Sequence, residues 1–127
     1  MIHVKTTSKS VDEVALALET VVPGYKFGLL HVQDLKQTMA AKGVGFPHEC
    51  RVFEVCNPHH AATVLGEDIR VLLALPCRIG VWNDGGDTKV GTLLPTQLMG
   101  VFGDSRTMAE TAAEVEKTML AIIEDVI

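Results

Sequence analysis

Residues 77–94 read CRIGVWNDGGDTKVGTLL, and this stretch decides the fold class. Two runs with strand-like composition, Cys77 to Trp82 and Thr88 to Leu94, flank the loop NDGGD at residues 83–87. Asn, Asp and Gly tolerate the positive φ angles of tight turns, so this pattern predicts a β-hairpin. The two strands of a hairpin are antiparallel, which favours a mostly antiparallel sheet over a doubly wound parallel one.

Three further strands are predicted before the hairpin, at Ile2 to Thr7, Lys26 to Gln33 and Arg51 to Cys56. Simple alternation along the second of them assigns two faces. Gly28, Leu30 and Val32 share one face, and Phe27, Leu29 and His31 share the other.

Helices are predicted between these strands because each begins with a capping residue. Ser10 and Glu13 form a capping box before a helix that ends at Pro23-Gly24. Asp34 caps a short helix through Lys42, and Asn57 caps another from Pro58 to Leu65 that Gly66 closes. The apolar run from Ile69 to Leu75 fits neither element type clearly, and Pro76 then interrupts any strand ladder.

A long helix with a regular apolar stripe is predicted at the end of the chain. It begins at Ser105 or Thr107, and Thr107 and Glu110 have the spacing of a second capping box. The stripe consists of Met108, Ala112, Val115, Met119, Ile122 and Val126. Residues 93–103 are expected to be irregular, with room for one more short strand. The prediction is one α+β domain, residues 1–127, with helices over one face of the sheet.

Charge and composition exclude several classes of partner. The net charge of the 127 residues is −5, and the lysines are scattered among acids, so nucleic acid is not an expected partner. No segment approaches the roughly 20 apolar residues that span a bilayer, and the N-terminus lacks a signal peptide, so we expect a cytoplasmic protein without membrane contact. In that compartment its three cysteines are expected to be free thiols.

The stretch EVCNPHH at residues 54–60 is the strongest candidate for chemistry. Alternation places Glu54 and Cys56 on one face of a strand, and a helix starts directly afterwards. The amides and dipole of a helix N-terminus can lower the pKa of a nearby thiol, and they favour neutral imidazole at His59 and His60. If Cys77 lies on an adjacent strand, two thiols and an imidazole come together.

The same residues also fit a purely structural role. Free cysteine is among the most buried residue types and packs as a small hydrophobic side chain, and histidines in a first helical turn are commonly exposed. No C-x-x-C or H-x-x-x-H spacing occurs, although zinc would need four ligands from groups such as Cys50, Cys56, Cys77, His48, His59 and His60. The sequence therefore leaves open whether any metal binds.

Several motifs together resemble the family known as domain of unknown function 302. They are Phe27-Gly28, Asp34, Cys56-Asn57-Pro58 with Ala61, and Pro76-Cys77-Arg78 in a strand that ends near Trp82, where the family usually has Tyr. The resemblance spans about Val11 to Pro95. It implies a curved antiparallel sheet like that of the TATA-binding protein, and a homodimer. It transfers no catalytic residue, and likeness to a DNA-binding fold does not imply DNA binding.

Three functions are consistent with these observations. The first is a homodimeric protein that binds a small molecule or a metal ion in a concavity of the sheet. Its candidate ligand-binding residues are Glu54, Cys56, Asn57, His59, His60 and Cys77. The second is a thiol-dependent enzyme that acts on sulfur or electrophilic substrates, with Cys56 as thiolate and His59 or His60 as base. The third is a structural interaction module without chemistry.

Overall fold

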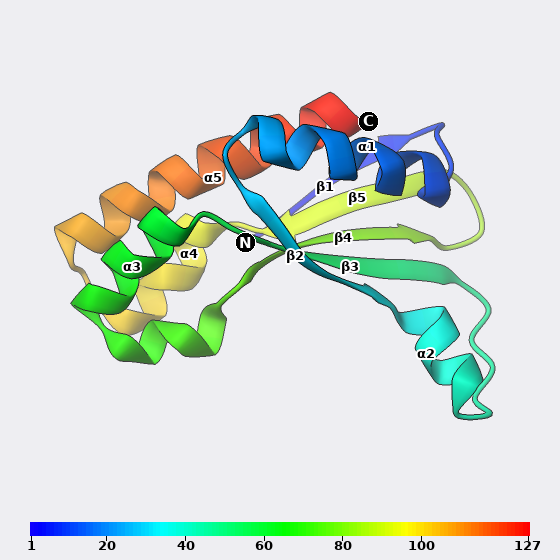
Figure 1. Ribbon diagram of the computed structural model, residues 1–127, viewed down its shortest axis with the longest axis horizontal. Helices are drawn as coiled ribbons and strands as arrows, with labels where there is room; N and C mark the ends of the chain where they lie inside the picture. The colour runs from blue at the N-terminus through cyan, green and yellow to red at the C-terminus, as the bar shows by residue number, and fades with distance from the viewer.

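The computed structural model describes residues 1–127 and contains one five-stranded sheet with the strand order β1-β5-β4-β3-β2 (Figure 1). The strands are β1 (Ile2–Thr7), β2 (Gly28–Asp34), β3 (Glu49–Cys56), β4 (Cys77–Asn83) and β5 (Thr88–Leu93). Every neighbouring pair is antiparallel, and β4 and β5 form the predicted hairpin. The predicted α+β class is thereby confirmed.

Two long helices, α1 (Val11–Gly24) and α5 (Arg106–Val126), lie over one face of the sheet (Figure 1). The shorter helices α3 (Pro58–Glu67) and α4 (Pro95–Met99) gather at one end of it, together with the 3-10 helices η1 (Ile69–Ala74) and η2 (Gly100–Phe102). At the opposite end lies α2 (Leu35–Ala41). None of these helices has both the length and the apolar character needed to cross a bilayer.

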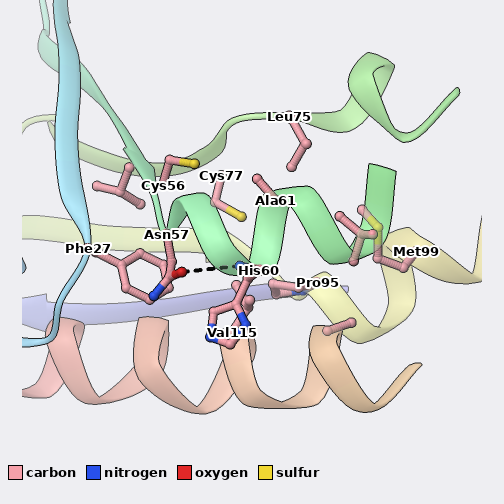
Figure 2. A pocket seen from close by; sticks show the side chains of 13 residues that line it. Phe27, Cys56, Asn57, His60, Ala61, Leu75, Cys77, Pro95, Met99 and Val115 are labelled. Atoms are coloured by element: carbon pink, nitrogen blue, oxygen red, sulfur yellow. Dashed lines mark hydrogen bonds between the residues drawn. The ribbon is translucent and has the colours of Figure 1, made fainter. Parts of the chain in front are cut away.

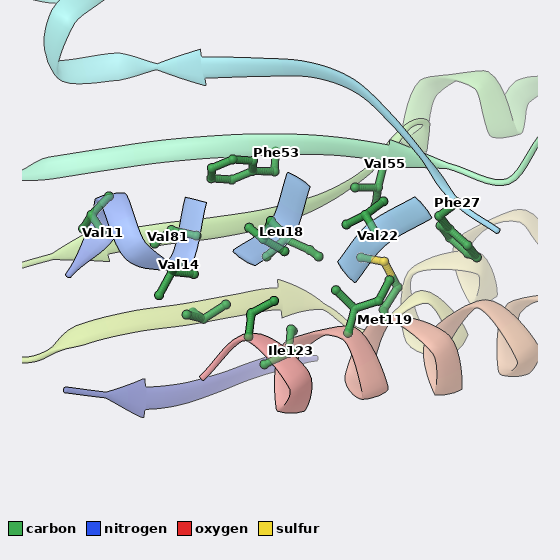
Figure 3. Packing of buried hydrophobic residues seen from close by; sticks show 14 of the residues in the cluster. Val11, Val14, Leu18, Val22, Phe27, Phe53, Val55, Val81, Met119 and Ile123 are labelled. Atoms are coloured by element: carbon green, nitrogen blue, oxygen red, sulfur yellow. The ribbon is translucent and has the colours of Figure 1, made fainter. Parts of the chain in front are cut away.

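The buried side chains form two separate clusters. The larger cluster contains 15 residues and fills the space between the sheet and the helices α1 and α5, with Leu18, Phe53 and Met119 at its centre (Figure 3). The smaller cluster contains five residues, among them Val64 and Met99, where α3, η1, α4 and the start of α5 meet. The helix α5 contributes to both, because its predicted stripe is buried over the whole length of the helix.

The predicted caps are present with one correction. The side chains of Ser10, Asp34 and Asn57 each accept backbone hydrogen bonds at the helix starts where they were expected. The last helix, however, is capped by Ser105, which accepts from the N–H of Met108, and the expected pair of Thr107 and Glu110 already lies inside the helix.

Two segments with weak patterns differ from expectation. The segment 93–103 contains no further strand. It forms α4 instead, because Pro95 occupies the first helical position, where a missing N–H costs nothing. The helix α3 continues through Gly66 to Glu67, and the apolar run after it becomes η1.

A β-bulge in β2 overturns the predicted alternation along that strand. The register passes from Leu29 opposite Val55 directly to His31 opposite Glu54, so Leu30 is the extra residue. Val32 therefore lies opposite the buried Phe53 and shares the helix-covered face with Leu29. A bulge inserts one residue and reverses the pattern beyond it, which a strict period of two cannot anticipate.

The face of the sheet away from α1 and α5, which we call the outer face, is unusually apolar at its centre. The indole of Trp82 lies across Gly80 and Gly91, whose missing side chains leave room for it. A Cβ atom on Gly91 would approach the carbonyl oxygen of His3 to 2.9 Å, so only glycine fits there. Val4 is opposite Gly91 in the register and is 41% exposed.

Candidate functional site

A small cavity lies where the two buried clusters meet (Figure 2). Its walls include Phe27 and Val55 from the larger cluster and Val64 and Met99 from the smaller one. The cavity has a volume of about 40 Å³, and ten of its 13 lining residues are hydrophobic. It exists because α3 and α4 pack against the start of α5 as a unit of their own and leave space beside the main core.

Both cysteines of the sequence prediction line this cavity. Cys56 ends β3, and Cys77 begins β4 opposite Val55. Figure 2 shows their side chains at the wall formed by these two strand ends, beside the first turn of α3. Cys50, the third cysteine, lies elsewhere, opposite Trp82 in the register.

The two thiols are weaker acids than an ordinary cysteine. Burial raises the pKa of Cys77 to about 11, and the neighbouring Cys56 adds to the increase. Burial also raises the pKa of Cys56. The expectation that the start of α3 lowers the pKa of Cys56 is thus wrong. Its amides are already engaged, because Asn57 Oδ1 accepts from the N–H groups of His59 and His60 at 2.9 and 3.1 Å.

The two histidines have different surroundings. The His60 side chain is 27% exposed and lines the cavity. Its ring centroid lies 6.4 Å from that of Phe27, and its Nδ1 lies 3.9 Å from Glu114 Oε2 of α5. His59 is exposed and does not line the cavity. His60 is therefore the imidazole that the fold brings to the thiols.

Glu54 lies apart from this cavity. It is opposite Arg78 in the register, and its carboxylate accepts a hydrogen bond of 3.1 Å from the Gln33 amide. Of the six predicted ligand-binding residues, the structure brings four to the cavity: Cys56, Asn57, His60 and Cys77.

The donor groups do not form a metal site. No three His, Cys, Asp or Glu side chains gather closely enough to hold a metal ion. His48 packs edge-on against Phe46, with ring centroids 5.6 Å apart, and does not line the cavity. The cavity instead offers polarisable sulfur, one imidazole and aliphatic surface, which suits a mostly apolar ligand.

Sequence reasoning missed several residues of the cavity wall. Ala61 carried a signal, because it belongs to the Cys-Asn-Pro motif. Val115 also carried one, as part of the apolar stripe of the last helix. Pro95 and Met99 carried none, since they belong to a segment that was expected to be irregular.

The largest hollow of the molecule is a polar one at the other end of the sheet. It has a volume of about 480 Å³ and is lined by Arg51, Asp12 and Glu49, among others. Arg51 lies 2.5 Å from Asp12 and 3.6 Å from Asp34, so its charge is already neutralised within the fold. An open hollow whose charges pair with one another holds a ligand less readily than a partly enclosed apolar cavity.

Comparison with known proteins gives a family and a fold. No protein with a curated description matches this chain. The model of the family Domain of unknown function DUF302 matches residues 2–126. A crystal structure of an uncharacterized conserved protein DUF302 from Bacillus stearothermophilus is 32% identical in sequence and superimposes with a TM-score of 0.92. The match covers 99% of this chain and 98% of that chain. The chain belongs to the DUF302 family.

Proposed function

We propose that this protein binds a compact, mostly apolar molecule in the cavity between α3, α4, α5 and the ends of β3 and β4. One observation carries the proposal. The end of β3 and first turn of α3, with Cys56 and His60, meet Cys77 at the start of β4 on one cavity, whose other lining residues apart from Asn57 are apolar. Close packing normally removes such spaces from a protein interior, so a cavity with polarisable groups on its wall is a reasonable binding site.

The size of the cavity limits the ligand and its affinity. A volume of about 40 Å³ has room for roughly three water-sized groups, at ~10–15 Å³ each. The best small ligands gain about 1.5 kcal/mol per non-hydrogen atom, so three such atoms give about 4.5 kcal/mol. That corresponds to a dissociation constant of the order of 1 mM.

The protonation state of the thiols favours binding over catalysis. A nucleophilic cysteine reacts as the thiolate, whereas the raised pKa of Cys77, about 11, keeps its sulfur protonated near neutral pH. A protonated thiol is a weak hydrogen-bond donor on a soft, polarisable atom. Burial also raises the pKa of Cys56, the nucleophile that the enzyme alternative requires, so the thiol-dependent enzyme is the less favoured alternative. A metal ion is also disfavoured, because no three His, Cys, Asp or Glu side chains gather closely enough to hold one.

Xenon is a suitable first probe, because a single apolar and polarisable atom fits a small dry cavity. Methyl-resolved NMR spectra of the protein under xenon should show shifts confined to the lining methyl groups of Val64, Val115 and Met99. Ala61→Leu fills the cavity and should abolish these shifts, whereas Ala113→Leu, at an exposed position of α5, should preserve them. Shifts that persist in Ala61→Leu, or that spread over the whole surface, would contradict the proposal.

We propose in addition that two copies associate through the outer face of the sheet. An antiparallel sheet with one open face normally carries polar side chains on that face. Here Ile2 and Leu93 are 70% and 47% exposed and form a depression of about 230 Å³ with Val4, Val52 and Trp82. An apolar centre with an aromatic anchor is the usual composition of an interface core.

A second copy is the occupant that fits this face in area and in charge. Five strands about 4.8 Å apart and about six residues long, at ~3.3 Å each, cover roughly 500 Å² per copy. Two such faces reach the ~1,000 Å² that a specific interface needs. The face carries Glu54 as well as Arg78 and Lys89, so it is close to neutral in a chain with a net charge of −5.

Sedimentation velocity at several concentrations tests this association. The dimer fraction should rise with salt, because salt screens the repulsion between two acidic copies. Val4→Lys should produce monomers, while Leu16→Lys, at a 64% exposed position on α1, should leave the dimer intact. A native chain that stays monomeric at about 100 μM, a concentration well above Kd for a micromolar interface, would refute the association.

A further inference from the structure

A second cavity adjoins the first and extends it toward the outer face. Its volume is about 60 Å³, and its walls include Ala74, Leu98 and Leu93. Cys77, Pro95 and Met99 line both cavities and therefore form the partition between them. Met99 is the adjustable part of this partition, since its unbranched side chain adapts its shape at little cost.

The second cavity lies where two strands separate. The ladder between β4 and β5 ends at the pair of Gly80 and Gly91. Beyond that pair, the carbonyl oxygen of Arg78 accepts a 2.7 Å hydrogen bond from the side chain of Thr92. Arg78, Thr92 and Leu93 line both this second cavity and the depression on the outer face.

Arg78 is the one arginine of the chain without an ion pair. Arg51, Arg70 and Arg106 lie 2.5, 2.6 and 2.9 Å from carboxylate oxygens. The register neighbour of Arg78, Glu54, forms a hydrogen bond with Gln33. An exposed guanidinium without an ion pair therefore lines the second cavity, and its planar fork suits an anionic oxygen head group.

We infer that the ligand is a short unbranched apolar chain with a carboxylate at one end. This inference rests on the proposed function and names its ligand class. The carboxylate pairs with Arg78, and the chain runs past Met99 into the cavity beside Cys77 and Cys56. Because Arg78 belongs to the outer face, this ligand binds in competition with a second copy. Cavities of about 40 and 60 Å³ have room for roughly seven water-sized groups in total, which corresponds to a chain of about six carbons.

Titration calorimetry with hexanoate, hexanol and acetate tests the ligand class. Hexanoate should bind about tenfold more tightly than hexanol, because a charge-assisted hydrogen bond is roughly twice as strong as a neutral one. It should also bind more tightly than acetate, which lacks the apolar chain. Arg78→Gln should reduce the affinity for hexanoate to that for hexanol. Arg106→Gln, which removes an exposed arginine of α5, should leave the affinities for hexanoate and hexanol unchanged.

A second variant separates the two parts of the site. Ala74→Leu fills the second cavity, so it should weaken the binding of hexanoate and leave the xenon-induced shifts at the first cavity unchanged. If xenon binds but hexanoate and hexanol bind equally, and neither Arg78→Gln nor Ala74→Leu alters them, the carboxylate inference is wrong and the proposed function stands. If xenon causes no shifts in the lining methyl groups, the proposed function itself fails.

Discussion

The acidity of Cys77 gives the sharpest test of how the cavity works. Its pKa of about 11 leaves roughly 0.1% of the thiol ionised at pH 8, whereas a free cysteine with a pKa of about 8.5 is roughly 24% ionised. The rare thiolate is intrinsically more nucleophilic, by a factor of about 10 to 20 for a Brønsted coefficient of ~0.4–0.5. Cys77 should therefore react about 20-fold more slowly than the free amino acid, before any hindrance by the cavity wall.

Exchange with a small pyridyl disulfide, followed by acid quenching and peptide mass spectrometry, measures each cysteine separately without any substitution. The rate for Cys77 should keep rising up to about pH 11, while that of free cysteine levels off above about pH 8.5. In urea, where burial is lost, all three cysteines should react like the free amino acid. A native Cys77 that matches free cysteine at pH 8 and levels off near pH 8.5 would refute the buried, protonated thiol.

Three further predictions concern stability and are measured by urea unfolding. Because the pKa of Cys77 is raised in the folded state, its contribution to the free energy of unfolding is complete below about pH 9 and is lost as the pH rises toward 11. This loss, about 2 to 3 kcal/mol, should be absent in Cys77→Ser. Gly91→Ala should destabilise the fold by about 1–3 kcal/mol through the contact of its Cβ with a backbone carbonyl oxygen, whereas Gly80→Ala, with its nearest contact at 3.5 Å, should cost no more than half as much. Asn57→Ala should cost about 1 kcal/mol by removing two hydrogen bonds at the start of α3; an unchanged midpoint would show that water replaces the cap.

Features encoded by neighbouring residues were predictable from the sequence. The hairpin follows from five turn-forming residues between two strands, and the cap at Asn57 follows from Asn-Pro before an apolar run. Each depends on contacts within a few residues, so no tertiary information is needed. The stripe of α5 was equally clear, because a helix with one buried face must repeat its apolar residues every three or four positions.

Features that depend on packing between distant segments were not predictable. The bulge at Leu30 needs the register with β3, and the cavity needs the position of Met99 relative to α3. The pKa of Cys56 is raised by burial, and the extent of burial is set by the surrounding fold. Their spacing in the sequence correctly predicted that Cys56 and His60 belong to the same site. It also suggested Glu54 and His59, which the fold directs away from the cavity.

The cost of the cavity helps to distinguish a binding site from imperfect packing. An unfilled space of about 40 Å³ costs roughly 1 kcal/mol, at about 24 cal/mol per Å³. Ala61→Leu should recover part of that stability whether or not the cavity has a function, because any side chain that fits an empty space adds favourable contacts. Stability alone therefore does not decide between the two interpretations. A binding site requires that the same variant loses xenon and hexanoate, since natural proteins commonly retain destabilising features where a ligand must enter. A variant that gains stability and keeps its ligands would mean that the space beside Cys77 is a packing defect and that the ligands bind elsewhere.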